Sequence, residues 1–498
     1  MRVLASDSGA VFIAPTTKWR SRQPLQRATH GHRWRLHTAR RLPFLQDQSF
    51  LMNQKIDSGS LADLVARLVE AAKRAGADAS DAVAVRSRST SVSVRLGKVE
   101  NTEAAESDDV SLRVFLGNRT ASVSANASSD PASLAERAVA MAKVSPEDPH
   151  QRLADQALLA RSIRDLDLFD ATELSAERLR EDALAMEAAA MAVPGVTNSS
   201  GSGASVGMGG LVLATSHGFL GQYMATRFSR SVSVIAGEGT GMERDYDFSS
   251  RLHFADLDPV AEIGRKAGER ATRRLGARKA RTGPVTVIYD PRVARGIAGH
   301  LAGAINGASV ARKTSFLREM MGKKVASAGI TVTDDPLKLR GQSSRPFDGE
   351  GVQGQSLTMV DRGVLGHWFL STSTASELGL QTNGRGVRAS SSVSPSSTNL
   401  AIEPGEQSPE ELVRSLKSGF YVTEVFGQGV NMVTGEYSRG ASGFWIENGE
   451  LAWPVSEVTI AANLRDMFLN MVPASDLDRN FGTAAPTLLV EGMTLAGE

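Results

Sequence analysis

The chain has 498 residues, with 56 Lys and Arg against 55 Asp and Glu, 41% hydrophobic residues and no cysteine. This composition is typical of a globular protein and is long enough for more than one domain with its own core. Because there is no cysteine, disulfides, thiolate zinc sites, iron–sulfur clusters and cysteine nucleophiles are excluded, and we expect a cytoplasmic protein.

The N-terminal segment differs from the rest of the chain in charge. Residues 1–51 contain nine Lys and Arg but only Asp7 and Asp47, whereas the remaining residues carry a net charge of −6. They show no sustained helical or alternating apolar pattern. We interpret them as a basic extension that is disordered or lies upstream of a true start at Met52. A nucleic-acid-binding arm and an organelle-targeting leader are the alternatives.

The next part, about residues 52–160, is predicted to combine helices with antiparallel strands. Apolar residues recur at helical spacing over 61–72. The period then changes to two over 83–116, with a turn at Gly97, which predicts an antiparallel meander with one buried face. An Asp-Pro pair opens a second predicted helix over 130–143.

The following part, about 161–281, repeats this mixture. A helix is predicted over 172–192, a β-rich run over 206–234, and a long helix over about 258–281 that ends in a basic run. We interpret that run as a solvated helix end and not as a nucleic-acid patch. Gly283 and its following proline then mark the main domain boundary.

The C-terminal part, residues 282–498, is predicted to be rich in β-structure. A buried-type strand over 285–289 precedes a helix over 291–306, and short strands separated by glycine turns follow. Asn448-Gly449 is the strongest hairpin signal, whereas the Ser-rich stretch 389–398 is predicted to be a loop. The fold class is therefore α+β, with an N-terminal α/β domain over 52–281 and a β-rich C-terminal domain over 282–498.

Two motifs that could support catalysis lack their structural context. Gly203–Gly207 matches the G-x-S-x-G pattern of serine hydrolases, but a strand-like run follows it where a helix is required. His300 lies on the predicted helix 291–306, where a helical zinc motif would need a neighbouring Glu and a second His. Positions 301, 304 and 305 are Leu, Ala and Ile, so His300 is interpreted as a packing residue.

Several longer motifs resemble the PmbA (TldE) branch of the TldD/PmbA metallopeptidase family. The resemblance covers residues 52–498 and excludes 1–51. The matching segments are 242–246, 299–301, 304–305, 307–310, 312–313, 346–348, 350–352, 435–441, 443–445, 447–450, 454–457, 459–461 and 463–464.

The resemblance implies a two-domain chain that pairs with a TldD-like subunit as a heterodimer, or forms a homodimer. In such a pair the TldD-like chain carries an HExxxH helix and a cysteine as third zinc ligand, and the pair cleaves unfolded peptides in a closed cavity. His300 falls at the first His of that motif, Leu301 at the Glu and Ile305 at the second His. We therefore expect no catalytic residue, metal or cofactor in this chain, zinc in the partner, and a role in forming the cavity.

Two other functions stay open at this stage. The first is an autonomous metallopeptidase with unusual ligands such as His253, His300 or His367 and nearby carboxylates. The second is a nucleic-acid-binding or targeted protein that uses residues 1–51. No stretch approaches the 18 or so apolar residues of a membrane span, so no membrane role is expected.

Overall fold

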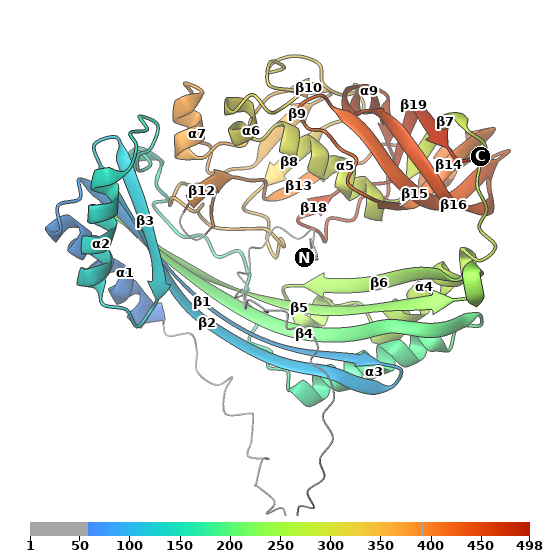
Figure 1. The fold of residues 1–498 in the computed structure, drawn as a ribbon, viewed down its shortest axis with the longest axis horizontal. Helices are drawn as coiled ribbons and strands as arrows, with labels where there is room; N and C mark the ends of the chain where they lie inside the picture. The colour runs from blue at the N-terminus through green and yellow to red at the C-terminus, as the bar shows by residue number, and fades with distance from the viewer. Residues whose placement is uncertain (1–57, 390–391) are drawn as a thin grey trace, which may run out of the picture.

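The computed structural model describes residues 58–389 and 392–498. The basic extension predicted at residues 1–51 lies outside them. Within the described ranges the fold is α+β, as predicted. A long curved sheet with helices on its convex side forms the N-terminal part, and a β-rich C-terminal part faces the concave side (Figure 1).

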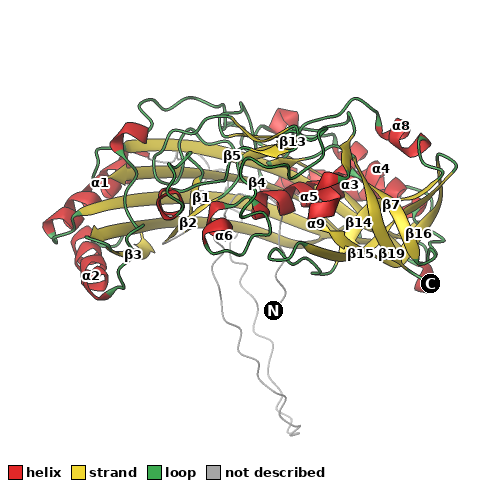
Figure 2. Cartoon of the chain, turned by 90° about the horizontal axis from the view of Figure 1, so that it is seen from above, coloured by secondary structure: helices red, strands yellow, loops and turns green. Residues whose placement is uncertain are grey.

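The N-terminal part is built on one six-stranded antiparallel sheet, in the order β3-β2-β1-β4-β5-β6. The pairing of β1 with β4 joins the early and late strands into a single layer. The strands are β1 (Ala79–Arg95), β2 (Lys98–Leu116), β3 (Arg119–Asn126), β4 (Val196–Thr215), β5 (Leu220–Ala236) and β6 (Glu243–Arg251). The helices on the convex face are α1 (Ser58–Arg74), α2 (Pro131–Val144), α3 (Ala176–Met191) and α4 (Val260–Arg273). Figure 2 shows α1 and α2 near one end of the long strands and α3 and α4 nearer the other.

The start of β1 is buried on both faces of this sheet. Ala82 and Ala84 pack in the cluster that contains α1, whereas Val83 packs with Phe347 of the C-terminal part. The prediction of a meander with one buried face is therefore wrong for this stretch. The reason is that the C-terminal part covers the face that was expected to meet water.

Strand β4 begins earlier than the predicted β-rich run at 206. It starts at Val196 and passes a register shift beside Gly201, whose φ of +123° suits glycine. The Gly203–Gly207 motif lies inside this strand, so it forms no strand-to-helix turn of the kind that a serine nucleophile requires.

The C-terminal part contains two sheets, and helix α5 (Pro291–Ala304) contacts both. The larger sheet has the order β16-β15-β14-β7-β19-β17, and an additional pairing of β16 with β19 closes it into a ring. Its strands are β7 (Gly283–Tyr289), β14 (Ser418–Phe426), β15 (Glu436–Glu447), β16 (Glu450–Asn463), β17 (Met471–Pro473) and β19 (Leu488–Ala496).

The smaller sheet has the order β10-β9-β8-β13-β18. Its strands are β8 (Val332–Asp335), β9 (Leu357–Asp361), β10 (Val364–Leu365), β13 (Asn399–Ile402) and β18 (Thr483–Ala484). The remaining elements are α6 (Gly307–Ala311), α7 (Thr372–Glu377), α8 (Pro409–Arg414), α9 (Leu464–Leu469) and the pair β11 (Gly386–Ala389) and β12 (Ser392–Pro395). No helix of the described part is long and apolar enough to cross a membrane.

The two turn predictions for the C-terminal part have different outcomes. Asn448 and Gly449 connect β15 to β16 with φ values of +50° and +83°, so this predicted hairpin is confirmed. The loop predicted over 389–398 is wrong for Ala389 and for 392–395, because these residues pair as strands β11 and β12, whereas 396–398 form no helix or strand. A distant residue holds this pair in place, since the N–H of Gly386 donates to Asp348 at 2.8 Å.

A buried charge network joins the two parts at the start of β1. The carboxylate of Asp81 lies 2.5 Å from Arg113 on β2 and 2.7 Å from Arg388 on β11, and Arg113 also lies 3.6 Å from Glu350. Burial raises the pKa of Asp81, but the charges of Arg113 and Arg388 outweigh it and hold the pKa below its usual range. The network is almost completely hidden from water.

Asp348 is a second carboxylate beside this network. Its Oδ1 accepts the N–H groups of Glu350 and Val352 at 2.8 and 2.9 Å, and its Oδ2 accepts that of Gly386. Burial, and after it the Glu350 carboxylate, raises the pKa of Asp348 to about 6, although the backbone donors and Arg345 act in the opposite direction.

A second network joins the parts at the other end of the sheet. Arg274, which follows α4 as its C-cap, lies 2.7 Å from Glu424 on β14, and Arg292 on α5 lies 2.8 Å from Asp245 on β6. The strand registers place Asp245 opposite the end of β5 that is remote from Asp81. The concave sheet is thus tied to the C-terminal part at both ends.

Replacing Asp81 by Ala leaves Arg113 and Arg388 buried without their shared carboxylate. We expect the Asp81→Ala substitution to lower the free energy of unfolding by about 3–5 kcal/mol, measured by urea denaturation. Asp108→Ala is the matched control, because it removes a 40% exposed partner of Arg86 from the same two strands and should cost less than about 1 kcal/mol. Equal losses in the two variants would contradict the prediction.

The titration of Asp348 predicts a pH dependence. The folded-state pKa of Asp348 lies above the ordinary value of 3.8. The contribution of this residue to the free energy of unfolding is therefore greatest below pH 3.8 and is lost as the pH rises through about 6. The Asp348→Asn variant lacks this titration and one carboxylate acceptor, so it should be less stable by about 1–3 kcal/mol at acidic pH. Urea denaturation over a pH series should show this deficit shrinking towards neutral pH, and a deficit that grows instead would refute the assignment.

Candidate functional site

Helix α5 carries the positions that the sequence analysis singles out. Asp290 caps its N-terminus by accepting the N–H of Arg292 at 2.9 Å, and Pro291 occupies the first helical turn. Because the helix lies against both sheets of the C-terminal part, its apolar face is buried. That face consists of Val293, Ala294, Ile297, Ala298, Leu301 and Ala304.

The structure places the three motif positions in different surroundings. Leu301 is 1% exposed and Ile305, which follows the last helical residue, is fully buried, and both lie in the main core. His300 is half-buried, with its ring 6.0 Å from that of Tyr437 in an edge-to-face arrangement. Since only one of the three side chains has an atom that can bind a metal, these positions do not fit a zinc site.

The surface of α5 that borders His300 is open. Gly296 and Gly299 are exposed, and a Cβ added at either position would meet no other atom within 4 Å. Two glycines therefore form the helix surface next to the imidazole.

The other candidate histidines lie on different elements. His253 follows β6, with Nε2 2.9 Å from the carbonyl oxygen of Asp167 and Nδ1 3.9 Å from a carboxylate oxygen of Asp170. His367 follows β10, and desolvation, together with the charge of Arg385, lowers its pKa. Across residues 58–389 and 392–498 no three His, Cys, Asp or Glu side chains are placed to hold a metal ion, so His253, His300 and His367 do not form such a group.

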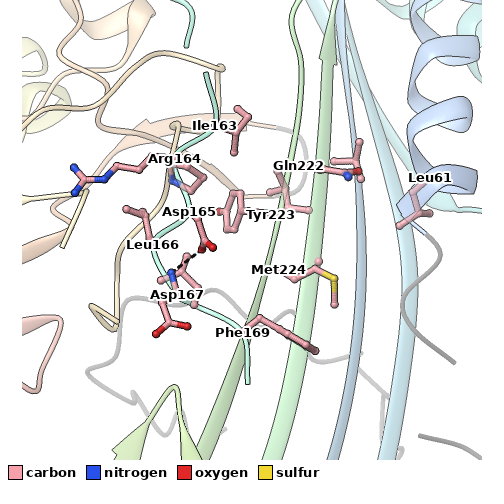
Figure 3. A pocket seen from close by; sticks show the side chains of 15 residues that line it. Leu61, Ile163, Arg164, Asp165, Leu166, Asp167, Phe169, Gln222, Tyr223 and Met224 are labelled. Carbon is pink, nitrogen blue, oxygen red and sulfur yellow. Dashed lines mark hydrogen bonds between the residues drawn. The ribbon is translucent and has the colours of Figure 1, made fainter. Parts of the chain in front are cut away.

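A pocket of about 470 Å³ lies between β5 and the segment 163–169 (Figure 3). Its lining includes Leu61 of α1, Gln222, Tyr223 and Met224 of β5, and Pro346 of the C-terminal part. Tyr223 packs against Phe347, whose ring lies 5.4 Å away. Burial raises the pKa of the Tyr223 hydroxyl.

The sequence analysis missed this pocket. Five separate segments contribute to it, and only Pro346 belongs to a motif that the sequence analysis singled out. The alternating apolar and polar residues of β5 predict a strand. They do not show which parts of its edge pair with another strand.

Comparison with known proteins gives a consistent result along the chain. Models of the PmbA/TldA metallopeptidase match residues 80–142 as domain 1, residues 169–275 as the central domain and residues 282–497 as the C-terminal domain. The solved structure of TldE from Thermococcus kodakarensis has the same fold, with a TM-score of 0.77 and 21% identity over 87% of this chain and all of that one.

Two curated relatives are more similar in sequence. The metalloprotease PmbA of Escherichia coli O157:H7 is 37% identical over 428 residues, which cover 84% of this chain and 93% of that protein. The metalloprotease PmbA homolog of Haemophilus influenzae is 36% identical over 450 residues, which cover 89% and 97%. The chain belongs to the PmbA (TldE) branch of the PmbA/TldD metallopeptidase family.

Proposed function

We propose that this chain is the PmbA/TldE-like subunit of a cytoplasmic two-chain zinc peptidase that degrades unfolded peptides. In this proposal a TldD-like partner holds the metal and performs the hydrolysis. The observation that supports it most directly is the burial of Leu301 and Ile305 at the positions where the partner's motif has its Glu and second His.

Ligand chemistry explains why we assign catalysis to the partner. A catalytic zinc site needs three protein ligands and one open position for water. Of the three motif positions here only His300 has a donor atom, and the chain contains no cysteine. A change of rotamer cannot supply the missing ligands, because the side chains of Leu and Ile contain no atom that can bind a metal.

The contribution we propose for this chain is to shape the space in which the peptide lies. Its long sheet presents a concave face towards the C-terminal part (Figure 1). Ion pairs with the C-terminal part at both ends of the sheet hold that face in position. A rigid wall of this kind is suited to confine a flexible peptide near a metal that belongs to another chain.

The first test is a peptidase assay on unfolded, fluorescently labelled casein. We expect cleavage by the mixture of this chain with a TldD-like partner and none by this chain alone. Zinc analysis of the separated chains should find the metal in the partner. Full activity of the isolated chain would refute the proposal and favour an autonomous peptidase.

The second test uses the His300→Ala variant in the assembled pair. Since His300 is not a metal ligand in this proposal, we expect the zinc content to be unchanged and the rate to stay within about twofold of the wild type. The control is an alanine at the first His of the partner's HExxxH motif, which should abolish both zinc binding and peptidase activity. Loss of zinc from this chain on His300→Ala would instead support a metal site built from its own histidines.

A further inference from the structure

The outer edge of β5 lacks a neighbouring strand along its first half. β5 pairs with β4 from Leu220 onward, but its pairing with β6 begins only at Phe228. Thr226 marks the transition, because its N–H points outward and donates to the carbonyl of Leu168 at 3.0 Å. One backbone contact with segment 163–169 therefore takes the place of a strand.

The backbone of Gln222 and Met224 points to the same side as that of Thr226. Alternate residues of a strand direct their N–H and C=O groups the same way, and the β4–β5 register is unbroken over this stretch. No group among the described residues hydrogen-bonds to the outward N–H or C=O of Gln222 or Met224. Two successive outward positions of β5 thus offer unpaired donors and acceptors.

These free groups border the pocket between β5 and segment 163–169 (Figure 3). On the helix side of β5 the pocket is lined by Leu61 and Met224, which belong to the cluster around α1. On the other side it is lined by Tyr223 and Pro346. Its volume of about 470 Å³ lies within the range of roughly 300–1,000 Å³ that is typical of ligand pockets.

We propose that an extended segment of an unfolded polypeptide binds in this pocket as an additional strand on β5. A row of outward donors and acceptors at every second residue matches another extended backbone, whereas a helix has already used its own groups internally. Alternate side chains of the bound segment would meet the Leu61 side and the Tyr223 side in turn. The identification of this segment with substrate rests on the proposed function.

The surroundings predict tolerance towards sequence. Arg164 and Asp165 are both exposed at the pocket and have opposite charges. The third charged residue of the lining, Asp167, is paired with Arg340, so neither sign is favoured. Main-chain hydrogen bonds supply affinity that does not depend on side chains. A site of this type suits a subunit that handles many unfolded peptides.

The test is fluorescence anisotropy with the full chain alone, without partner or metal. The probe is a fluorescein-labelled peptide of about ten residues in which Val and Thr alternate with Ser and Lys. Gln222→Pro removes an outward N–H and blocks the edge, a substitution that edge strands tolerate. We expect it to weaken binding at least about tenfold, whereas the matched control Gln222→Ala, which keeps the N–H, should bind within about twofold of the wild type.

A second probe avoids altering the protein. The same peptide with N-methyl groups on all its central backbone nitrogens keeps its side chains but loses its donors on both edges. We expect it to bind at least about tenfold more weakly to the wild type. Thermal melting of Gln222→Pro within a few degrees of the wild type would show that its loss of binding does not come from unfolding.

Three results would overturn the proposal. In the first, N-methylation of the peptide does not weaken its binding to the wild type. In the second, the Gln222→Pro variant is well folded and binds the peptide normally. In the third, the chain self-associates through this edge and binds no peptide. Because the assay needs no catalysis, its failure leaves the proposed function intact. Conversely, peptide binding here together with an inactive pair would refute the peptidase proposal alone.

Discussion

The arrangement of the whole molecule depends on the carboxylate of Asp81, which two arginines from opposite sides of the interface share. Burying such charges is costly, and the attraction between them roughly offsets that cost, so the network adds little net stability. The network fixes the relative positions of the strands that it joins, because a guanidinium in any other position would be buried without a partner. The position of β11 relative to β1 and β2 is therefore fixed. The pairs at Arg274 and Arg292 fix the other end in the same way.

The segment 346–352 connects this framework to the pocket. Pro346 lines the pocket, and Phe347 packs edge-to-face against Tyr223 and against Phe219 at 5.0 Å. Asp348 then gathers backbone N–H groups, including one from β11, and Glu350 faces Arg113. One short motif thus contributes to the apolar contact, the charge network and the lining of the pocket. Its resemblance to a metallopeptidase motif therefore comes with a structural role.

Local signals in the sequence predicted much of the fold. The apolar period of α1 and the left-handed turn at Asn448-Gly449 act over a few residues, so they can be recognised without knowing the rest of the chain. The double burial around Val83 could not be predicted in this way, since residues far apart in the sequence create it. The β11–β12 pair is local, but its Ser-rich sequence is typical of a loop, and the distant Asp348 accepts the N–H of Gly386. The same distinction applies to the candidate sites. The apolar character of Leu301 and Ile305 is visible in the sequence, whereas the free edge of β5 appears only when β6 is seen to end its pairing at Phe228.

The burial of Leu301 and Ile305 also shows how deeply the difference from a metal-binding helix is built into α5. Introducing Glu and His at these positions would place a carboxylate and an imidazole in a core that is closed to water, where an unpaired charge is strongly disfavoured. Exchanging side chains alone would therefore not recreate a zinc site, because the surrounding core would also have to open towards solvent. This packing is the reason why we propose that the partner chain, and not this one, holds the metal. In that proposal the partner keeps its helix accessible for a metal, whereas this chain uses the equivalent helix to join two sheets.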